Sequence, residues 1–120
     1  HVNVGNNVTI GAMTTIHQFC QIGDYSFAGM NTSITMDVPA YIKVASNPAR
    51  VIGLNSVGME RAGINQETIS ILKKVYKIIY RKGFNLKDAI AKVESMDCFN
   101  VEEVQNFISS LKSSERGILR

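Results

Sequence analysis

The chain has 120 residues, of which 45% are hydrophobic and 19% charged, and its net charge is +3 at pH 7. These values are typical of a globular protein of about one domain's length and exclude a disordered or fibrous chain. No apolar run approaches the roughly 18 residues that a membrane span requires, so we expect no membrane insertion and no signal peptide. The two cysteines and two histidines show no ligand spacing, which predicts reduced thiols in a cytoplasmic protein without a bound metal.

The first forty residues repeat with a period of six. An aliphatic residue recurs at every sixth position, and a small or β-branched residue stands four positions after it. The aliphatic positions are Val4, Ile10, Ile16, Ile22, Ala28 and Ile34. Neither a helix nor an alternating strand of a β-sandwich has this period, whereas the hexapeptide coils of a parallel β-helix do. Stacked coils would place these side chains in inward columns, so we predict a parallel β-helix.

The chain begins in phase with this repeat. Because about three repeats are usually needed to bury a core, two coils alone would be marginal. We therefore expect further coils upstream, which would make this chain the C-terminal part of a longer solenoid. Pro39 ends the repeat, and an extended strand is expected over 41–44. Residues 1–50 are assigned to the last coils and an exit strand, and residues 51–64 to a connector.

From Asn65 onward the hydrophobic period becomes helical. Asn65 is a good N-cap for a first helix, and Asn85 for a second, shorter one. Asn100 with Glu103 resembles a capping box and predicts the start of a third helix. Residues 65–120 are therefore predicted to form a small three-helix domain after the β-helix.

The first predicted helix carries a cluster of basic side chains roughly opposite its apolar stripe. The cluster consists of Lys73, Lys74, Lys77 and Arg81. A solvated helix face is the usual explanation for such a run. Nucleic acid is not expected as a partner, because the chain has no base-stacking aromatic pattern and no recognised binding motif.

Several motifs are more specific than the repeat. They are Ile16-His17-Gln18-Phe19-Cys20, Asp37-Val38-Pro39, Ser46-Asn47-Pro48-Ala49, Leu54-Asn55 with Gly58 and Arg61, and Arg116-Gly117-Ile118-Leu119-Arg120. Together they resemble the UDP-N-acetylglucosamine O-acyltransferases, which perform the first step of lipid A synthesis. The resemblance covers the whole chain.

The resemblance implies a left-handed β-helix that assembles as a homotrimer, with active sites between subunits. It implies transfer of a 3-hydroxyacyl chain from acyl carrier protein to the 3-hydroxyl of the glucosamine in UDP-N-acetylglucosamine, without a cofactor. In this family a histidine acts as general base, and its match lies upstream of His1. A glycine that donates to the oxyanion would directly precede His1. We therefore expect no catalytic residue in this chain and no activity of the chain alone.

The resemblance also assigns substrate contacts. His1 matches a histidine close to the sugar, and His17 and Gln18 match residues that line the cleft. Asn55 and Arg61 match positions that contact the uridine diphosphate, for which the planar fork of arginine is suited. Without the resemblance, His17 and Arg61 would be interpreted as ordinary surface side chains.

Met30 matches the position that closes the acyl pocket and measures chain length. The alternative is that Met30 merely packs at a coil corner, as flexible methionine does well. An acidic acyl carrier protein is the expected partner of the basic helix face, which would steer it to the cleft.

Two other functions stay open. A related hexapeptide transferase could acylate an amino group of a modified UDP-sugar. A module without chemistry of its own could trimerise and bind the carrier protein.

Overall fold

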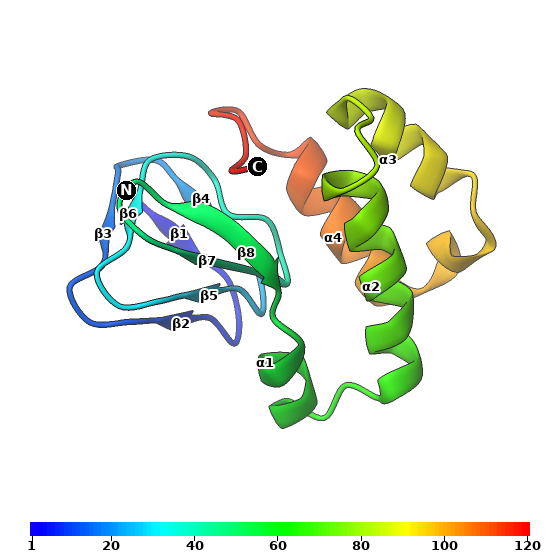
Figure 1. Ribbon diagram of the computed structural model, residues 1–120, viewed down its shortest axis with the longest axis horizontal. Helices are drawn as coiled ribbons and strands as arrows, with labels where there is room; N and C mark the ends of the chain where they lie inside the picture. The colour runs from blue at the N-terminus through cyan, green and yellow to red at the C-terminus, as the bar shows by residue number, and fades with distance from the viewer.

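The computed structural model describes residues 1–120, and Figure 1 shows a β-helical half beside a helical half. Six two-residue strands build the coils. They are β1 (Asn3–Val4), β2 (Thr9–Ile10), β3 (Thr15–Ile16), β4 (Gln21–Ile22), β5 (Phe27–Ala28) and β6 (Ser33–Ile34). They pair in parallel as β1–β4, β2–β5 and β3–β6, and the paired residues, such as Asn3 and Gln21, lie 18 positions apart. The hexapeptide repeat thus corresponds to stacked coils of three hexapeptides each.

The inward-facing aliphatic side chains are buried in the second coil and partly exposed in the first. Ile22, Ala28 and Ile34 are at most 3% exposed, as the period predicted. The first coil has no coil of this chain above it, so Val4 is 51% and Ile10 is 40% exposed. The fully buried residues of the apolar core therefore begin in the second coil, with Ile22, and continue into the helices.

Glycine after the aliphatic position allows one coil to approach the next. A Cβ on Gly11 would lie 2.6 Å from the backbone nitrogen of Met30. A Cβ on Gly23 would fall against the backbone nitrogen of Ala40. Real Cβ atoms essentially never come this close to a backbone atom of another residue. Both positions therefore require glycine, which has no Cβ.

Beyond the coils, the sheet continues with two longer strands. β7 (Ile42–Ala45) pairs in parallel with β5 and antiparallel with β8 (Arg50–Leu54). The strand predicted over 41–44 is therefore confirmed, one residue later. The segment 51–64 is more structured than the predicted connector, because it holds most of β8 and the short helix α1 (Ser56–Arg61). β8 forms a local hairpin with β7, and Asn55, which caps α1, contacts Tyr25, 30 residues earlier; the hydrophobic pattern of this segment predicted neither.

The helical half consists of α2 (Gln66–Tyr80), α3 (Leu86–Glu94), a 3-10 turn η1 (Asp97–Asn100) and α4 (Glu102–Lys112). The predicted N-caps of α2 and α3 are confirmed: Asn65 Oδ1 accepts from Thr68 N–H, and Asn85 Oδ1 accepts from Asp88 N–H, each at 2.8 Å. None of these helices has the length and apolarity that crossing a bilayer demands.

The predicted capping box at the third long helix is wrong. Asn100 belongs to η1, and α4 begins at Glu102 after Val101, which makes no side-chain cap bond. The backbone explains the difference: the N–H of Val101 bonds to Cys98 O at 3.0 Å, which closes the 3-10 turn just where a cap was expected.

Helix α4 joins the two halves. Ala40 N–H donates to Ser110 Oγ at 3.0 Å, and the ring of Phe107 lies 6.3 Å from that of Tyr41. The last residues then return to the coils, where Ile118 forms a parallel bridge with Asp37. The helical half is thus fixed against the end of the β-helix by both side chains and backbone.

Candidate functional site

Three of the predicted substrate-binding residues share one corner of the coils. The His1 ring stacks on the Phe19 ring, with centroids 5.1 Å apart, and Phe19 N–H donates to His1 O at 2.7 Å. His17 and Gln18 directly precede Phe19, and His17 Nδ1 lies 3.1 Å from Gln18 O. All four side chains are exposed. The structure therefore places His1, His17 and Gln18 together on one accessible surface, which we call the histidine corner.

Phe19 is a member of this corner that the sequence interpretation missed. It lies 18 positions after His1, which is the length of one coil. The coil period itself therefore carried the signal that Phe19 lies directly below His1.

Asn55 is buried and its amide is engaged within the chain. Its Nδ2 donates to Tyr25 O at 2.8 Å, and its Oδ1 accepts from Gly58 N–H at 3.2 Å, which caps α1. Asn55 thus fixes α1 against the coils. Arg61 lies exposed in the last turn of that helix. No hydrogen bond or salt bridge joins Arg61 to His1, His17 or Gln18 within the chain.

Met30 projects from the corner of the second coil. Its side chain is 73% exposed and belongs to no part of the apolar core. Met13, in the coil above, is 81% exposed. Packing inside this chain therefore does not account for Met30, which leaves its side chain available for a contact outside the chain.

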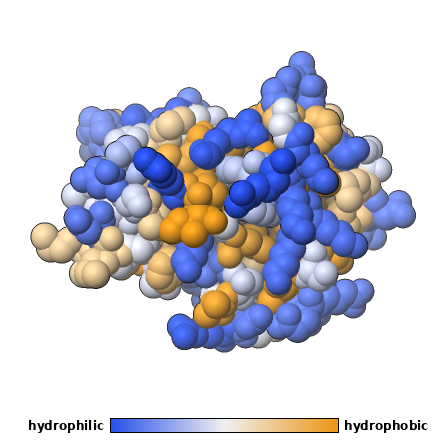
Figure 2. Space-filling model, in the orientation of Figure 1, coloured by the Kyte–Doolittle hydropathy of each residue, from blue (hydrophilic) through white to orange (hydrophobic).

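The basic residues of α2 lie on its outer face. Lys73, Lys74, Lys77 and Arg81 are exposed. The buried residues of the helix, among them Leu72, Val75 and Ile79, occupy the opposite face. Figure 2 shows hydrophilic surface over α2 beside apolar surface over β8 and α1. Ile52 and Val57 on those two elements are 51% and 55% exposed.

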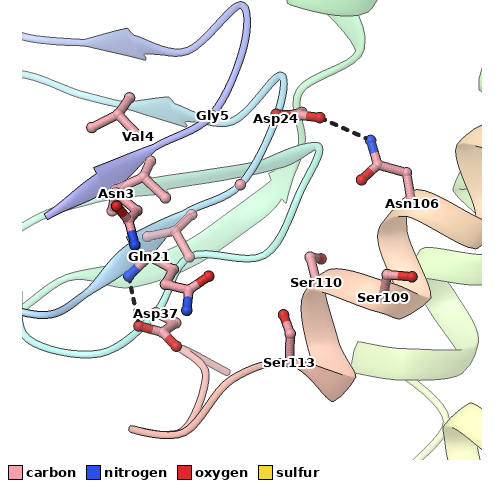
Figure 3. A pocket seen from close by; sticks show the side chains of 13 residues that line it. Asn3, Val4, Gly5, Gln21, Asp24, Asp37, Asn106, Ser109, Ser110 and Ser113 are labelled. Carbon is pink, nitrogen blue, oxygen red and sulfur yellow. Dashed lines mark hydrogen bonds between the residues drawn. The ribbon is translucent and has the colours of Figure 1, made fainter.

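A separate polar cavity of about 320 Å³ lies between the coils and α4 (Figure 3). Its coil wall carries Asn3, Gln21, Asp24 and Asp37, and its helix wall carries Asn106, Ser109, Ser110 and Ser113. Asn106 Nδ2 donates to Asp24 Oδ2 at 3.2 Å across its mouth. None of the substrate-binding residues predicted from the sequence lines it. It arises between segments that are far apart in the chain, and no local motif predicted it.

Burial is the largest cause of the pKa shifts of Tyr41 and Cys20. Burial raises the pKa of Tyr41 to about 12, against a smaller lowering by the hydrogen bond from Asn106. Burial also raises the pKa of the Cys20 thiol, which favours the unreactive neutral form. No group of three or more His, Cys, Asp or Glu side chains is arranged to hold a metal ion.

Stacked hexapeptide coils followed by a helical segment define a hexapeptide-repeat protein with a helical extension. Residues 37–119 match the family model described as UDP-N-acetylglucosamine O-acyltransferase, domain 2. The chain belongs to the UDP-N-acetylglucosamine O-acyltransferase family.

Relatives and solved structures agree with this assignment. The chain is 43% identical over 121 residues to the acyl-[acyl-carrier-protein]–UDP-N-acetylglucosamine O-acyltransferase of Stutzerimonas stutzeri, covering 100% of this chain and 46% of the relative. The structure of LpxA from Acinetobacter baumannii superposes with a TM-score of 0.93 at 42% identity, covering 100% of this chain and 46% of that one. The structure of the Bacteroides fragilis UDP-N-acetylglucosamine acyltransferase gives a TM-score of 0.94 at 33% identity, covering 99% of this chain and 46% of that one. The chain thus spans about half the length of the relatives it matches.

Proposed function

We propose that this chain is the C-terminal part of an acyltransferase that moves a 3-hydroxyacyl group from acyl carrier protein to the 3-hydroxyl of UDP-N-acetylglucosamine. This is the first step of lipid A synthesis and a cytoplasmic reaction. Membership of the family supports the proposal, and the observation that carries it is the histidine corner. Exposed imidazole and amide groups at one corner suit the recognition of a sugar, whose hydroxyls both donate and accept hydrogen bonds.

The chemistry requires two elements besides binding. A general base must take the proton of the attacking hydroxyl, and a donor must stabilise the negative charge that develops on the thioester oxygen. We assign the base and the oxyanion donor to residues that precede His1 in the intact protein. The role of His1, His17 and Gln18 is then to bind and orient the sugar nucleotide. This chain alone is expected to bind substrate weakly and to transfer no acyl group.

The diphosphate contact is assigned to Arg61. Its guanidinium is exposed and can donate two parallel bonds to phosphate oxygens. Asn55, whose amide caps α1 and holds Tyr25 O, supports this contact by fixing the helix that carries Arg61. The backbone N–H of Asn55 donates to Tyr41 O and its carbonyl accepts from Met59 N–H, so the second amide proton is the donor left to reach the nucleotide.

The acyl donor is assigned to two surfaces. Met30 closes the acyl pocket, and its 73% exposure in the single chain agrees with a pocket completed by a neighbouring subunit of a left-handed, homotrimeric β-helix. The basic face formed by Lys73, Lys74, Lys77 and Arg81 receives the acidic carrier protein. Exposed Ile52 and Val57 beside it provide the apolar contact area that charge steering alone lacks.

The test is acyl transfer by the intact protein that contains this chain, compared with residues 1–120 alone. Carrier-bound 3-hydroxyacyl donors of several lengths are offered with UDP-N-acetylglucosamine or with its 3-amino analogue. Transfer to the hydroxyl by the intact protein alone is the expected result. Exclusive transfer to the amine would favour the amino-sugar transferase, and binding of carrier protein without any transfer would favour a non-catalytic module. Activity of residues 1–120 would contradict the assignment of the base.

A further inference from the structure

We propose that Phe19 is a positioning residue that holds the imidazole of His1 in the orientation in which it meets the sugar. This inference rests on the proposed function, because it assigns His1 to the acceptor site. The two rings are 5.1 Å apart between centroids, with an angle of 26° between their planes. Such separations are those of stacked aromatic pairs that attract each other.

The backbone reinforces the ring contact. Phe19 N–H donates to His1 O at 2.7 Å, so the two residues are joined by main chain as well as by side chain. Phe19 has a φ of +67°, and the same turn position of the other hexapeptides has a similar φ, as in Met13 and Tyr25. This conformation therefore belongs to the coil turn, and the contacts with His1 are what set Phe19 apart.

Core packing does not explain the presence of an aromatic ring at this position. Phe19 is 59% exposed and takes no part in the hydrophobic core. Met13 occupies the corresponding corner one hexapeptide earlier, with a φ of +61° and no aromatic partner, so the backbone conformation does not demand a ring. The contact that distinguishes Phe19 from Met13 is the stack on His1.

The stack leaves the hydrogen-bonding edge of His1 free. Neither ring nitrogen of His1 makes a hydrogen bond within the chain, whereas His17 Nδ1 is already directed to Gln18 O at 3.1 Å. A ring held by its face and open at its edge can offer one nitrogen to a sugar hydroxyl without first losing rotational freedom. Preorganisation of this kind improves binding mainly by lowering the entropy lost when the ligand arrives.

The test compares Phe19→Leu, which removes the ring, with Phe19→Tyr, which keeps it, in the intact protein. Met13→Leu is the matched control, since it changes an exposed apolar side chain at the equivalent corner. For Phe19→Leu we expect the KM for UDP-N-acetylglucosamine to rise about tenfold, with the KM for the acyl donor unchanged, as lost acceptor binding predicts. Phe19→Tyr and Met13→Leu should stay within about twofold of the wild type, which is the size of ordinary surface effects.

A spectroscopic measurement separates positioning from general damage. The ring protons of His1 should move downfield in the NMR spectrum of Phe19→Leu, because the ring current of Phe19 is lost, and should not move in Phe19→Tyr. Unchanged His1 resonances in Phe19→Leu would overturn the stack. Changed resonances with a wild-type KM would overturn its role in acceptor binding. If Phe19→Leu fails to fold, Phe19→Met serves in its place.

The inference can fail separately from the proposed function. If the wild-type protein transfers no acyl group to UDP-N-acetylglucosamine, the proposed function is wrong, and calorimetric binding of that nucleotide then replaces the KM. Weaker binding by Phe19→Leu than by Phe19→Tyr would still support positioning. Equal binding by both variants would overturn it.

Discussion

The buried carboxylate of Asp37 accepts a hydrogen bond from the hydroxyl of Ser114 at 2.6 Å. Its other oxygen accepts from Gln21 N–H in the β-helix at 2.8 Å. The main chain of Asp37 also bonds to Gly117 O and to Leu119 N–H, at 3.0 and 2.9 Å. One residue at the end of the coils thus holds the returning C-terminal segment against β4.

Replacing Asp37 should therefore loosen the junction between the two halves. Asp37→Ala leaves the partly buried Gln21 N–H and Ser114 hydroxyl without their charged acceptor, and we expect it to lower the free energy of unfolding by about 2 kcal/mol. Urea unfolding of the intact protein measures the effect. Asp97→Ala, which removes an exposed carboxylate from η1, is the matched control and should change stability by less than about 0.5 kcal/mol. Equal losses in both variants would contradict the assigned role of Asp37.

The glycine at the corner of the second coil gives a sharper test of coil stacking. A methyl group on Gly23 would collide with the backbone of Ala40, whereas nothing lies within 4 Å of a methyl group on Gly53. Because backbone cannot move aside as a side chain can, we expect Gly23→Ala to cost about 3 kcal/mol. Gly53→Ala should be close to neutral. Thermal unfolding of the two variants compares them directly. A wild-type melting temperature for Gly23→Ala would show that Ala40 does not pack closely against Gly23.

Patterns that repeat along the chain were predicted from the sequence, whereas features that join distant segments were not. The period of six led to the buried column of Ile22, Ala28 and Ile34, because every coil meets the same steric demand. Helix α1 escaped prediction because Asn55, which caps it, is held by Tyr25 O from 30 residues away. Strand β8 forms a local hairpin with β7, but its residues were interpreted as a connector because they show no strand alternation.

In the candidate site, too, local motifs could be predicted from the sequence, whereas contacts between distant segments could not. Motif resemblance supplied His1, His17 and Gln18, which the structure brings to one corner. The stacking of Phe19 on His1 could have been derived from the 18-residue coil, but a list of motifs does not contain it. The polar cavity beside α4 depends on how Asn106 and Asp24 meet, and no local pattern encodes that meeting.

Tyr41 should make the protein sensitive to alkali. An unfolded tyrosine loses its proton near pH 10, whereas burial raises the pKa of Tyr41 in the fold to about 12. Below pH 10 neither state is ionised and the contribution of Tyr41 to stability is complete. As the pH rises from 10 through 12, the unfolded state releases its proton first, so the contribution is lost. Urea midpoints measured between pH 8 and 11 should therefore fall with rising pH.

Tyr41→Phe identifies the responsible hydroxyl. This variant has no proton to lose, so its midpoint should fall less steeply above pH 10 than that of the wild type. At pH 8 it should be less stable by about 1 kcal/mol, because Asn106 Nδ2 loses its bond to the hydroxyl. Parallel pH profiles for the two proteins would assign the alkaline instability to other groups.

The basic face of α2 should act on the rate of encounter with the carrier protein. Lys77→Glu reverses one charge in this cluster, and we expect kcat/KM for a carrier-bound donor to fall about tenfold at low salt. The loss should shrink as salt screens the charges. Lys87→Glu makes the same change on α3, outside the cluster, and serves as the control. A donor bound to pantetheine alone should be used equally well by both variants, and equal losses with the full carrier would show that only net charge matters.

Met30 should set the length of the acyl chain. Its side chain is 73% exposed and fills space outside the coil, so Met30→Gly removes bulk from the pocket wall without opening a cavity in the core. We expect the preferred donor of the intact protein to become longer, because each further methylene that finds apolar contact adds about 0.8 kcal/mol of burial. Competition between 3-hydroxyacyl donors of different lengths measures the preference. Met13→Gly also removes an exposed methionine, in the coil above and at a turn position of positive φ that glycine adopts readily, and should keep the wild-type profile. A profile that shifts equally in both variants would reflect looser coils, and an unchanged profile in Met30→Gly would leave the measurement of chain length to other residues.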